Sequence, residues 1–116
     1  MSRGLLLPAG FGATAVAAGA FGAHALADHV TPERLETWRT AAHYHLVHAA
    51  VLLALELAPT PRVLPVRLFA LGILLFSGSL YLLVLLDIPV LGAVTPFGGV
   101  AFIAGWLSLA RSAARP

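Results

Sequence analysis

Residues 66–86 read VRLFALGILLFSGSLYLLVLL, and this stretch decides the fold. Arg67 is its only charged residue, and Asp87 and Pro89 follow its end. A helix of about 20 apolar residues, rising about 1.5 Å per residue, crosses the hydrocarbon core of a bilayer. The stretch therefore predicts a transmembrane α-helix rather than the core of a soluble domain.

The composition of the whole chain supports this interpretation. Of its 116 residues, 59% are hydrophobic and 10% are charged, against roughly 25% charged residues in ordinary soluble domains. Such a chain has too few polar side chains to cover a core in water, whereas lipid faces apolar side chains directly. The length suits a single domain, residues 1–116. The absence of cysteine excludes disulfides, thiolate metal sites and cysteine nucleophiles.

Three further apolar stretches predict three more crossings, at about residues 5–27, 38–57 and 95–110. The second is preceded by Thr31-Pro32-Glu33, which supplies a cap, a first-turn proline and an acid at the positive end of the helix dipole. The last begins with a similar signal at Thr95-Pro96. Because it is the shortest, it suggests a re-entrant or loop-packed start near Gly98-Gly99. We therefore predict an all-α, integral membrane four-transmembrane-helix bundle.

The first stretch has one rival interpretation. Met-Ser-Arg, an apolar run and then Ala18-Gly19-Ala20 resemble a secretory signal peptide with a small-residue cleavage site. The apolar run is long for the central region of a signal peptide, so we expect it to remain as the first crossing.

The arginines predict the orientation of the chain. With four crossings, the side that holds both termini and residues 58–65 carries Arg3, Arg62, Arg67, Arg111 and Arg115. The other side carries Arg34 and Arg39, together with the acids Asp28, Glu33, Glu36 and Asp87. The positive-inside rule then predicts a plasma (inner) membrane protein with both termini cytoplasmic. The scattered arginines favour no nucleic-acid partner, and the expected partner is the lipid bilayer.

Glu56 is the one acid within an apolar stretch. It lies close to the inner end of the second predicted helix, across a short loop from Arg62 and Arg67. We expect it to form an ion pair with one of these arginines, because an unpaired charge near the bilayer is costly.

Small residues predict where helices approach closely. In the first crossing they share an arc of about 100°, and they are Pro8, Gly12, Ala15, Gly19, Gly22 and Ala23. Ala101 and Gly105 form a similar pair in the last crossing. In lipid, helices associate through close backbone contact rather than through apolar burial. We interpret the stripe as packing within the bundle, and the alternative is a homo-oligomer or a contact with other membrane proteins.

Polar side chains gather in the half of the bundle that is predicted to face outward. The set comprises His24, Tyr44, His45, His48, Ser77 and Tyr81. His48 lies about 15 Å along its helix from Trp38, which is expected at headgroup level. Polar groups inside a bilayer usually face the protein interior or a cavity. The cluster is therefore the candidate site of this chain.

Four kinds of chemistry suit this cluster. A network of hydrogen bonds that fixes helix register is the leading interpretation. A proton or small-solute path is the second, because histidine titrates near neutral pH. A metal or haem site on His24, His45 and His48 is less favoured, since no carboxylate or cysteine lies at matching depth. Nucleophilic catalysis by Ser77 or Ser79 is least favoured, because no buried carboxylate is available to orient a base.

Four motifs, one in each crossing, occur in order along nearly the whole chain. They are Gly19-Ala20-Phe21-Gly22-Ala23-His24, then Trp38-Arg39-Thr40-Ala41 with Tyr44 and His48, then Leu75-Phe76-Ser77-Gly78-Ser79-Leu80-Tyr81, then Thr95-Pro96-Phe97-Gly98-Gly99 with Gly105-Trp106. Together they resemble the YgdD-like family of small bacterial inner-membrane proteins. The resemblance implies a multi-pass membrane protein of unknown function, with no established catalytic residue, cofactor or substrate.

The same resemblance implies which positions to test first. They are His24, Tyr44, His48, Ser77, Ser79, Tyr81, Thr95 and Trp106. His43 and His45 fall outside the family pattern, which weakens a metal site that depends on His45.

These observations favour a structural or accessory membrane protein over an enzyme, and we expect neither a cofactor nor a metal. The reason is that the candidate residues include no complete catalytic or ligand set. The alternative function is passage of protons or a small solute through a polar cavity in the outer half of the bundle.

Overall fold

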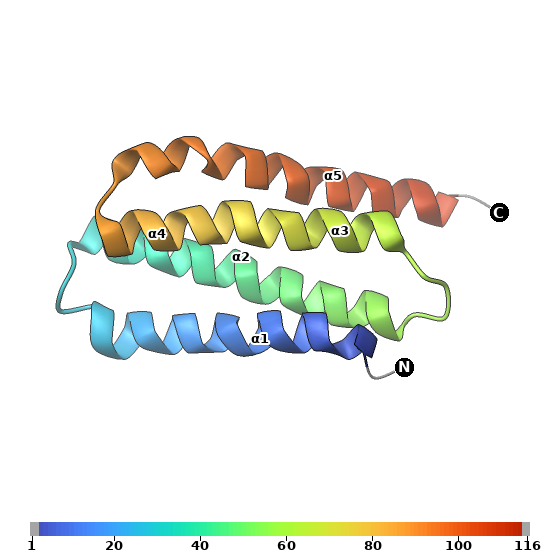
Figure 1. The fold of residues 1–116 in the computed structure, drawn as a ribbon, viewed down its shortest axis with the longest axis horizontal. Coiled ribbons are helices and arrows are strands. Elements are labelled where there is room, and N and C mark those ends of the chain that lie inside the picture. The colour runs from blue at the N-terminus through green and yellow to red at the C-terminus, as the bar shows by residue number, and fades with distance from the viewer. Residues whose placement is uncertain (1–2, 115–116) are drawn as a thin grey trace.

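The computed structural model describes residues 3–114, and these residues are helical apart from short connections. The first helix, α1 (Arg3–Phe21), continues into a π-helical turn, η1 (Gly22–Leu26). α2 (Pro32–Leu57) then runs back along it (Figure 1). The Thr31 hydroxyl accepts a hydrogen bond from the backbone N–H of Arg34 at 3.2 Å, so the predicted helix start is confirmed.

The second half of the chain repeats this antiparallel arrangement. α3 (Val63–Gly72), the π-helical η2 (Ile73–Ser77) and α4 (Gly78–Leu86) form one continuous helix. A short 3-10 helix, η3 (Pro89–Ala93), leads into α5 (Thr95–Ala114). The described chain thus contains four long helical rods, and the prediction of an all-α fold with four helices is confirmed.

Three of these rods are long and apolar enough, by length and composition, to cross a membrane: Gly4–Leu26, Val63–Leu86 and Pro89–Ala114. α2 is of similar length but less apolar, because it carries His43, His45 and His48 together with Glu56. Two of its histidines are buried, so the polarity of α2 is directed partly into the protein.

The last helix differs from the prediction. It was expected to be the shortest crossing and to begin in a re-entrant or loop-packed segment near Gly98-Gly99. Instead, α5 is regular through these glycines and continues to Ala114. Gly98 contacts the backbone of Phe76, where an added Cβ would overlap the chain. The two glycines therefore mark a close approach of α5 to η2, and the re-entrant interpretation is wrong.

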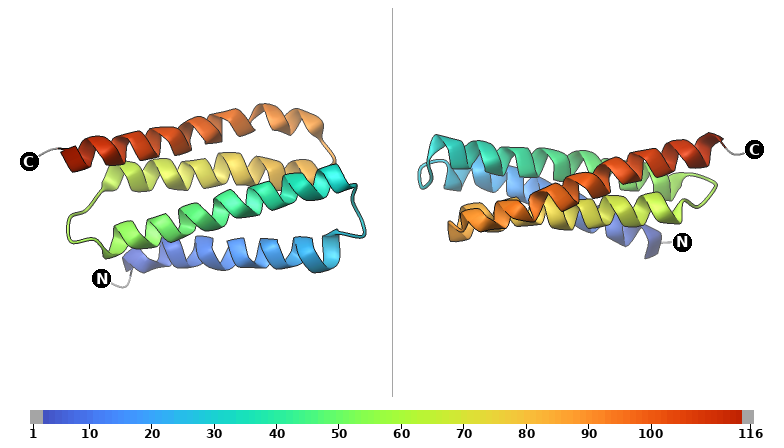
Figure 2. Two further views of the ribbon diagram at one scale, coloured as in Figure 1. Left: turned by 180° about the vertical axis from the view of Figure 1, so that it is seen from behind. Right: turned by 90° about the horizontal axis from the view of Figure 1, so that it is seen from above.

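The four rods lie side by side in chain order, and the molecule is flattened, with principal extents of 51 × 28 × 17 Å (Figure 2). α1 packs mainly against α2, and α3 packs mainly against α5. Both ends of the described chain and residues 58–62 lie at one end of the molecule, as Figure 1 shows. Arg62, Arg67 and Arg111 belong to the helix ends on this side, whereas Arg115 lies outside the described residues.

Two clusters of buried apolar side chains form the core. The central one contains Leu52, Phe69, Ile73 and Phe102. The other, at the opposite end from the termini, contains Leu26, Trp38 and Val84. Glycines let the helices approach closely at both clusters, since an added Cβ would overlap Phe102 at Gly72, Phe69 at Gly105 and Trp38 at Gly22.

The small residues of the first helix divide into two groups. Pro8, Ala15 and Gly22 are buried against the other helices, which confirms bundle packing for these positions. Gly12 and Gly19 have open space where a Cβ would stand, and Ala23 is exposed. Their alternative role in a homo-oligomer or in a contact with other membrane proteins stays a prediction.

Candidate functional site

His48 lies in an aromatic cluster where α2 meets α3 and α5. Its side chain is only 4% exposed. The ring stacks on Phe102 with centroids 3.9 Å apart, and it meets Phe69 and Trp106 at 5.4 and 5.9 Å. Tyr44, 41% exposed, lies against the other side of this cluster, with its ring 6.1 Å from those of His48 and Phe102.

The hydrogen bonds of His48 determine its tautomer. Nδ1 lies 2.8 Å from the backbone oxygen of Tyr44. A carbonyl only accepts, so Nδ1 must carry the proton. Nε2 is then the acceptor, and the indole N–H of Trp106 donates to it at 3.2 Å. The ring is neutral, and its one lone pair is already occupied.

His45, three residues earlier, is also buried and joins three helices. Its Nδ1 lies 2.8 Å from the Tyr81 hydroxyl, and its Nε2 lies 3.1 Å from the Thr14 hydroxyl. The Thr14 hydroxyl also donates to the backbone oxygen of Gly10 at 2.9 Å. Each proton in this chain finds an acceptor when Tyr81 donates to Nδ1 and Nε2 donates to Thr14. His45 therefore takes the opposite tautomer to His48.

The two serines connect the third rod to its neighbours. The Ser77 hydroxyl is fully buried and donates to the backbone oxygen of Ala41 at 2.8 Å. The hydroxyls of Ser79 and Thr95 lie 2.6 Å apart. Because Ser79 donates its proton to the backbone oxygen of Phe76, Thr95 is the donor to Ser79. Thr95 was predicted to cap the last helix, but its hydroxyl instead joins α5 to α4.

The structure brings most of the predicted positions into contact with one another or with a neighbouring polar side chain. Tyr44, His48 and Trp106 meet in the aromatic cluster, Tyr81 meets His45, and Ser79 meets Thr95. His24 stays apart: it lies in η1, its side chain is exposed, and it forms no hydrogen bond within residues 3–114.

The geometry gives no support to a metal or haem site on His24, His45 and His48. Within the described residues, no three side chains of His, Asp or Glu lie close enough together to hold a metal ion. Tyr81 and Thr14 occupy both ring nitrogens of His45, and the ring of His48 is occupied in the same way.

Sequence reasoning missed one contributor to the contacts between helices. Thr14 was not singled out, although it is the only hydroxyl-bearing residue between Pro8 and His24, and this was the signal that could have identified it. Trp38, which is expected at headgroup level, is buried between helices, and its indole N–H donates to the backbone oxygen of Ala18 at 2.7 Å. Trp38 therefore fastens α2 to α1.

Glu56 was expected to pair with Arg62 or Arg67, and this prediction is wrong. Among the described residues the ion pair is Arg34–Asp87, at 3.0 Å and at the other end of the molecule. The Glu56 carboxylate lies against Gly4 instead, at the positive end of α1, where the helix dipole favours a negative charge. Arg62 bonds to the hydroxyl of Ser112.

The polar network is closed within the part of the chain that the structure describes. Every buried side-chain nitrogen or oxygen there has a hydrogen-bond partner. Five pockets formed by residues 3–114 lie at the two ends of the molecule and in the groove between α1 and α2. None of these pockets is lined by His45, His48 or Tyr81.

Long apolar helices around a closed polar network define a multi-pass helical membrane protein. The chain belongs to the family described as protein of unknown function (DUF423), which matches residues 18–99. It is similar to UPF0382 membrane protein YwdK of Bacillus subtilis, with 44% identity over 108 residues and 87% of each chain covered. A UPF0382 membrane protein of Staphylococcus saprophyticus is 43% identical over 99 residues, 82% of each chain. No solved structure matches the chain.

Proposed function

We propose that this chain is a structural or accessory membrane protein rather than an enzyme. The observation that carries the proposal is the saturation of His45 and His48, whose four ring nitrogens each have a hydrogen-bond partner. A ligand to a metal needs a free nitrogen lone pair, and a catalytic base needs a lone pair that reaches the proton of a substrate, whereas here the donors are Tyr81 and Trp106 of the same chain. Side chains whose polar atoms form hydrogen bonds to neighbouring helices instead fix the register of the bundle.

We further propose four crossings, with both termini in the cytoplasm of the cell. Burial of His45 and His48 supports a crossing by α2, because two of the four polar groups that make it less apolar face protein rather than lipid. Arg62, Arg67 and Arg111 at the end that holds both termini support the orientation. The resemblance to YgdD-like proteins is compatible with the DUF423 family and is kept as part of this proposal.

Passage of protons or a small solute, the alternative function, has less support. A proton relay needs groups that both accept and donate a proton. The neighbours of His48 are a backbone carbonyl, which only accepts, and an indole N–H, which only donates. The second chain, through Tyr81, His45 and Thr14, ends on the backbone oxygen of Gly10. Neither chain offers a continuous path.

Two measurements on His48→Ala test the proposal, with His43→Ala as the matched control on the exposed side of the same helix. We expect the His48 variant to lose about 1–2 kcal/mol of unfolding free energy in detergent micelles, because it removes a buried ring and its bonds. The control should lose far less. In proteoliposomes, the wild-type chain should pass no more protons than empty vesicles. Proton flux that the His48 variant abolishes would overturn the proposal.

A further inference from the structure

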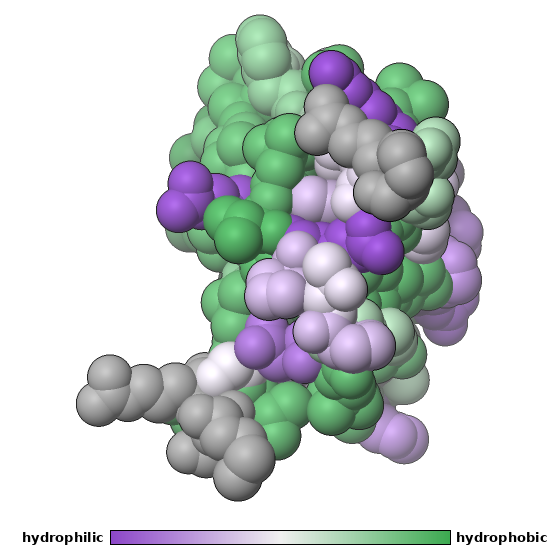
Figure 3. Space-filling view, turned by 90° about the vertical axis from the view of Figure 1, so that its right-hand side faces the viewer, coloured by the Kyte–Doolittle hydropathy of each residue, from purple (hydrophilic) through white to green (hydrophobic). Residues whose placement is uncertain are grey.

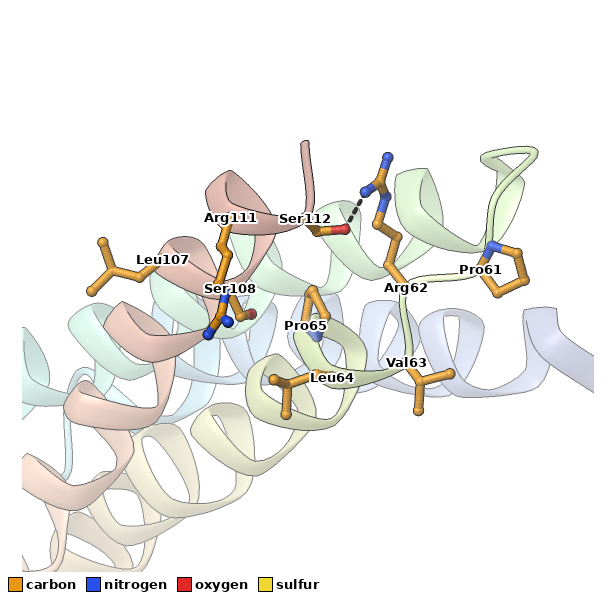
Figure 4. Close-up of a pocket in the computed structure, with 9 residues that line it drawn as sticks. All are labelled: Pro61, Arg62, Val63, Leu64, Pro65, Leu107, Ser108, Arg111 and Ser112. Carbon is orange, nitrogen blue, oxygen red and sulfur yellow. Dashed lines mark hydrogen bonds between the residues drawn. The ribbon is translucent and has the colours of Figure 1, made fainter. Parts of the chain in front are cut away.

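A pocket of about 490 Å³ opens at the end of the molecule that carries both ends of the described chain. It lies between the start of α3 and the last turns of α5, as Figure 4 shows. Its polar lining comes from Arg62, Ser108, Arg111 and Ser112. Its apolar lining comes from Val63, Leu64, Leu107 and two prolines, Pro61 and Pro65.

The pocket is positively charged. Two arginines line it, and no carboxylate does. Arg62 is held by its hydrogen bond to Ser112 (Figure 4). Arg111 is exposed, and it forms no ion pair with any residue in the described part of the chain. Two cationic side chains in one pocket attract an anion, and arginine suits phosphate oxygens because its planar guanidinium donates in pairs.

The walls of the pocket point to an amphiphilic ligand. Val63, Leu64 and Leu107 are 57%, 58% and 66% exposed, so a large apolar surface adjoins the two arginines. Figure 3 views this end of the molecule and shows hydrophilic residues between flanking apolar surfaces. The pocket therefore lies where the apolar, lipid-facing surface of two membrane-spanning rods gives way to charge.

We propose that this pocket binds the headgroup of an anionic phospholipid. The phosphate lies near Arg62 and Arg111, the hydroxyl of Ser112 donates to one of its oxygens, and the acyl chain runs along Leu64 and Leu107. The Ser108 hydroxyl keeps its hydrogen bond to the backbone oxygen of Gly105. Basic pockets between membrane helices bind anionic headgroups by this chemistry. A free phosphate compound has the same charge but makes no use of the exposed apolar walls, so the lipid is favoured.

Native mass spectrometry of the full chain in a neutral detergent tests the site. The chain is titrated with phosphatidylglycerol and, separately, with phosphatidylcholine, which has no net charge. Each arginine near a headgroup contributes roughly a fivefold preference for the anionic lipid. We expect the wild-type chain to prefer phosphatidylglycerol by at least about tenfold. Arg111→Gln should lower this preference roughly fivefold, and Arg62→Gln with Arg111→Gln should abolish it.

Two control variants separate the pocket from the general positive charge of the molecule. Arg67→Gln removes an arginine at the same end that does not line this pocket, and Arg39→Gln removes one near the other end. Both should keep the wild-type preference within about twofold, less than the effect of one headgroup contact. Circular dichroism checks that each variant is folded. Should the double variant aggregate, the exposed Arg111→Gln alone decides the test.

Three results would overturn the proposal. One is equal binding of the two lipids by the wild-type chain. Another is a loss of preference for phosphatidylglycerol in Arg67→Gln as large as that in Arg111→Gln. This result would indicate attraction by the overall positive charge rather than binding at a site. The third is displacement of phosphatidylglycerol by an equal concentration of glycerol phosphate, which would assign the pocket to a soluble phosphate compound.

Discussion

The indole N–H of Trp106 donates to Nε2 of His48 across 3.2 Å, and this bond joins residues that lie 58 positions apart in the sequence. It links α5 to α2 and leaves His48 with no free lone pair. The same two residues stand in the family-like motifs of the sequence. The hydrogen bond between them explains why a histidine and a tryptophan stand at these two positions, and it does so without a bound substrate.

Trp106→Phe should lower the free energy of unfolding by about 1 kcal/mol, because it keeps an aromatic ring but leaves Nε2 of His48 buried without a donor. Unfolding by titration with a denaturing detergent measures the change. A double-mutant cycle with His48→Phe should give a coupling of about 0.6 kcal/mol, the average for hydrogen bonds between membrane helices, and at most about 1.7 kcal/mol. A coupling of zero would show that the bond contributes nothing.

Gly98→Ala should be among the most damaging small substitutions in the chain. The added methyl group would overlap the backbone of Phe76, and backbone yields less readily than the end of a side chain. We expect a loss of about 3 kcal/mol or failure to fold. Gly99→Ala is the matched control, since its Cβ would lie an ordinary 3.9 Å from the Phe76 ring. Equal stability of the two variants would contradict the close approach of α5 to η2.

Tyr81→Phe and Tyr44→Phe form a second matched pair. Each removes one hydroxyl, but only the Tyr81 hydroxyl forms a hydrogen bond within the described residues, 2.8 Å from His45. Tyr81→Phe should therefore cost about 1 kcal/mol of unfolding free energy, and Tyr44→Phe should cost almost nothing. The same detergent titration compares them, and a larger loss for Tyr44→Phe would refute the assigned network.

The proposed orientation makes a simple prediction for reporter fusions. Alkaline phosphatase, which needs an oxidising compartment, should be inactive when fused after residue 114 and active when fused after residue 29. Green fluorescent protein should give the reverse pattern. The reason is the excess of arginine at the end of the molecule that holds both termini. Active phosphatase at the C-terminus would invert the topology.

The sequence was sufficient to predict the class of fold and the approximate position of each helix. Long apolar stretches and the Thr31-Pro32 start signal determine local helix formation, so they can be recognised in the sequence without knowledge of how the helices pack. The extent of α5 could not be predicted, because Gly98-Gly99 suggests a break. Only the neighbouring backbone of Phe76 explains why glycine is needed in a regular helix.

The sequence predicted most of the residues that form the candidate site, but it did not predict which of them contact one another. Helical periodicity places Tyr44, His45 and His48 near one face, but the partners of the histidines come from other helices. Thr14 and Trp106 lie 31 and 58 residues from the histidines that they contact. The position of Glu56 beside Gly4 likewise depends on how α1 packs against α2. Such relationships follow from tertiary packing alone.

Nitrogen NMR of ¹⁵N-histidine-labelled protein in micelles or bilayers tests whether the buried histidines are neutral structural elements with opposite tautomers. We expect a proton on Nδ1 of His48 and on Nε2 of His45. Trp106→Phe should shift the Nε2 signal of His48 and leave that of His45 in place. A doubly protonated ring at either position at neutral pH, or the same tautomer at both, would show that the two histidines are not the neutral pair assigned from their hydrogen bonds.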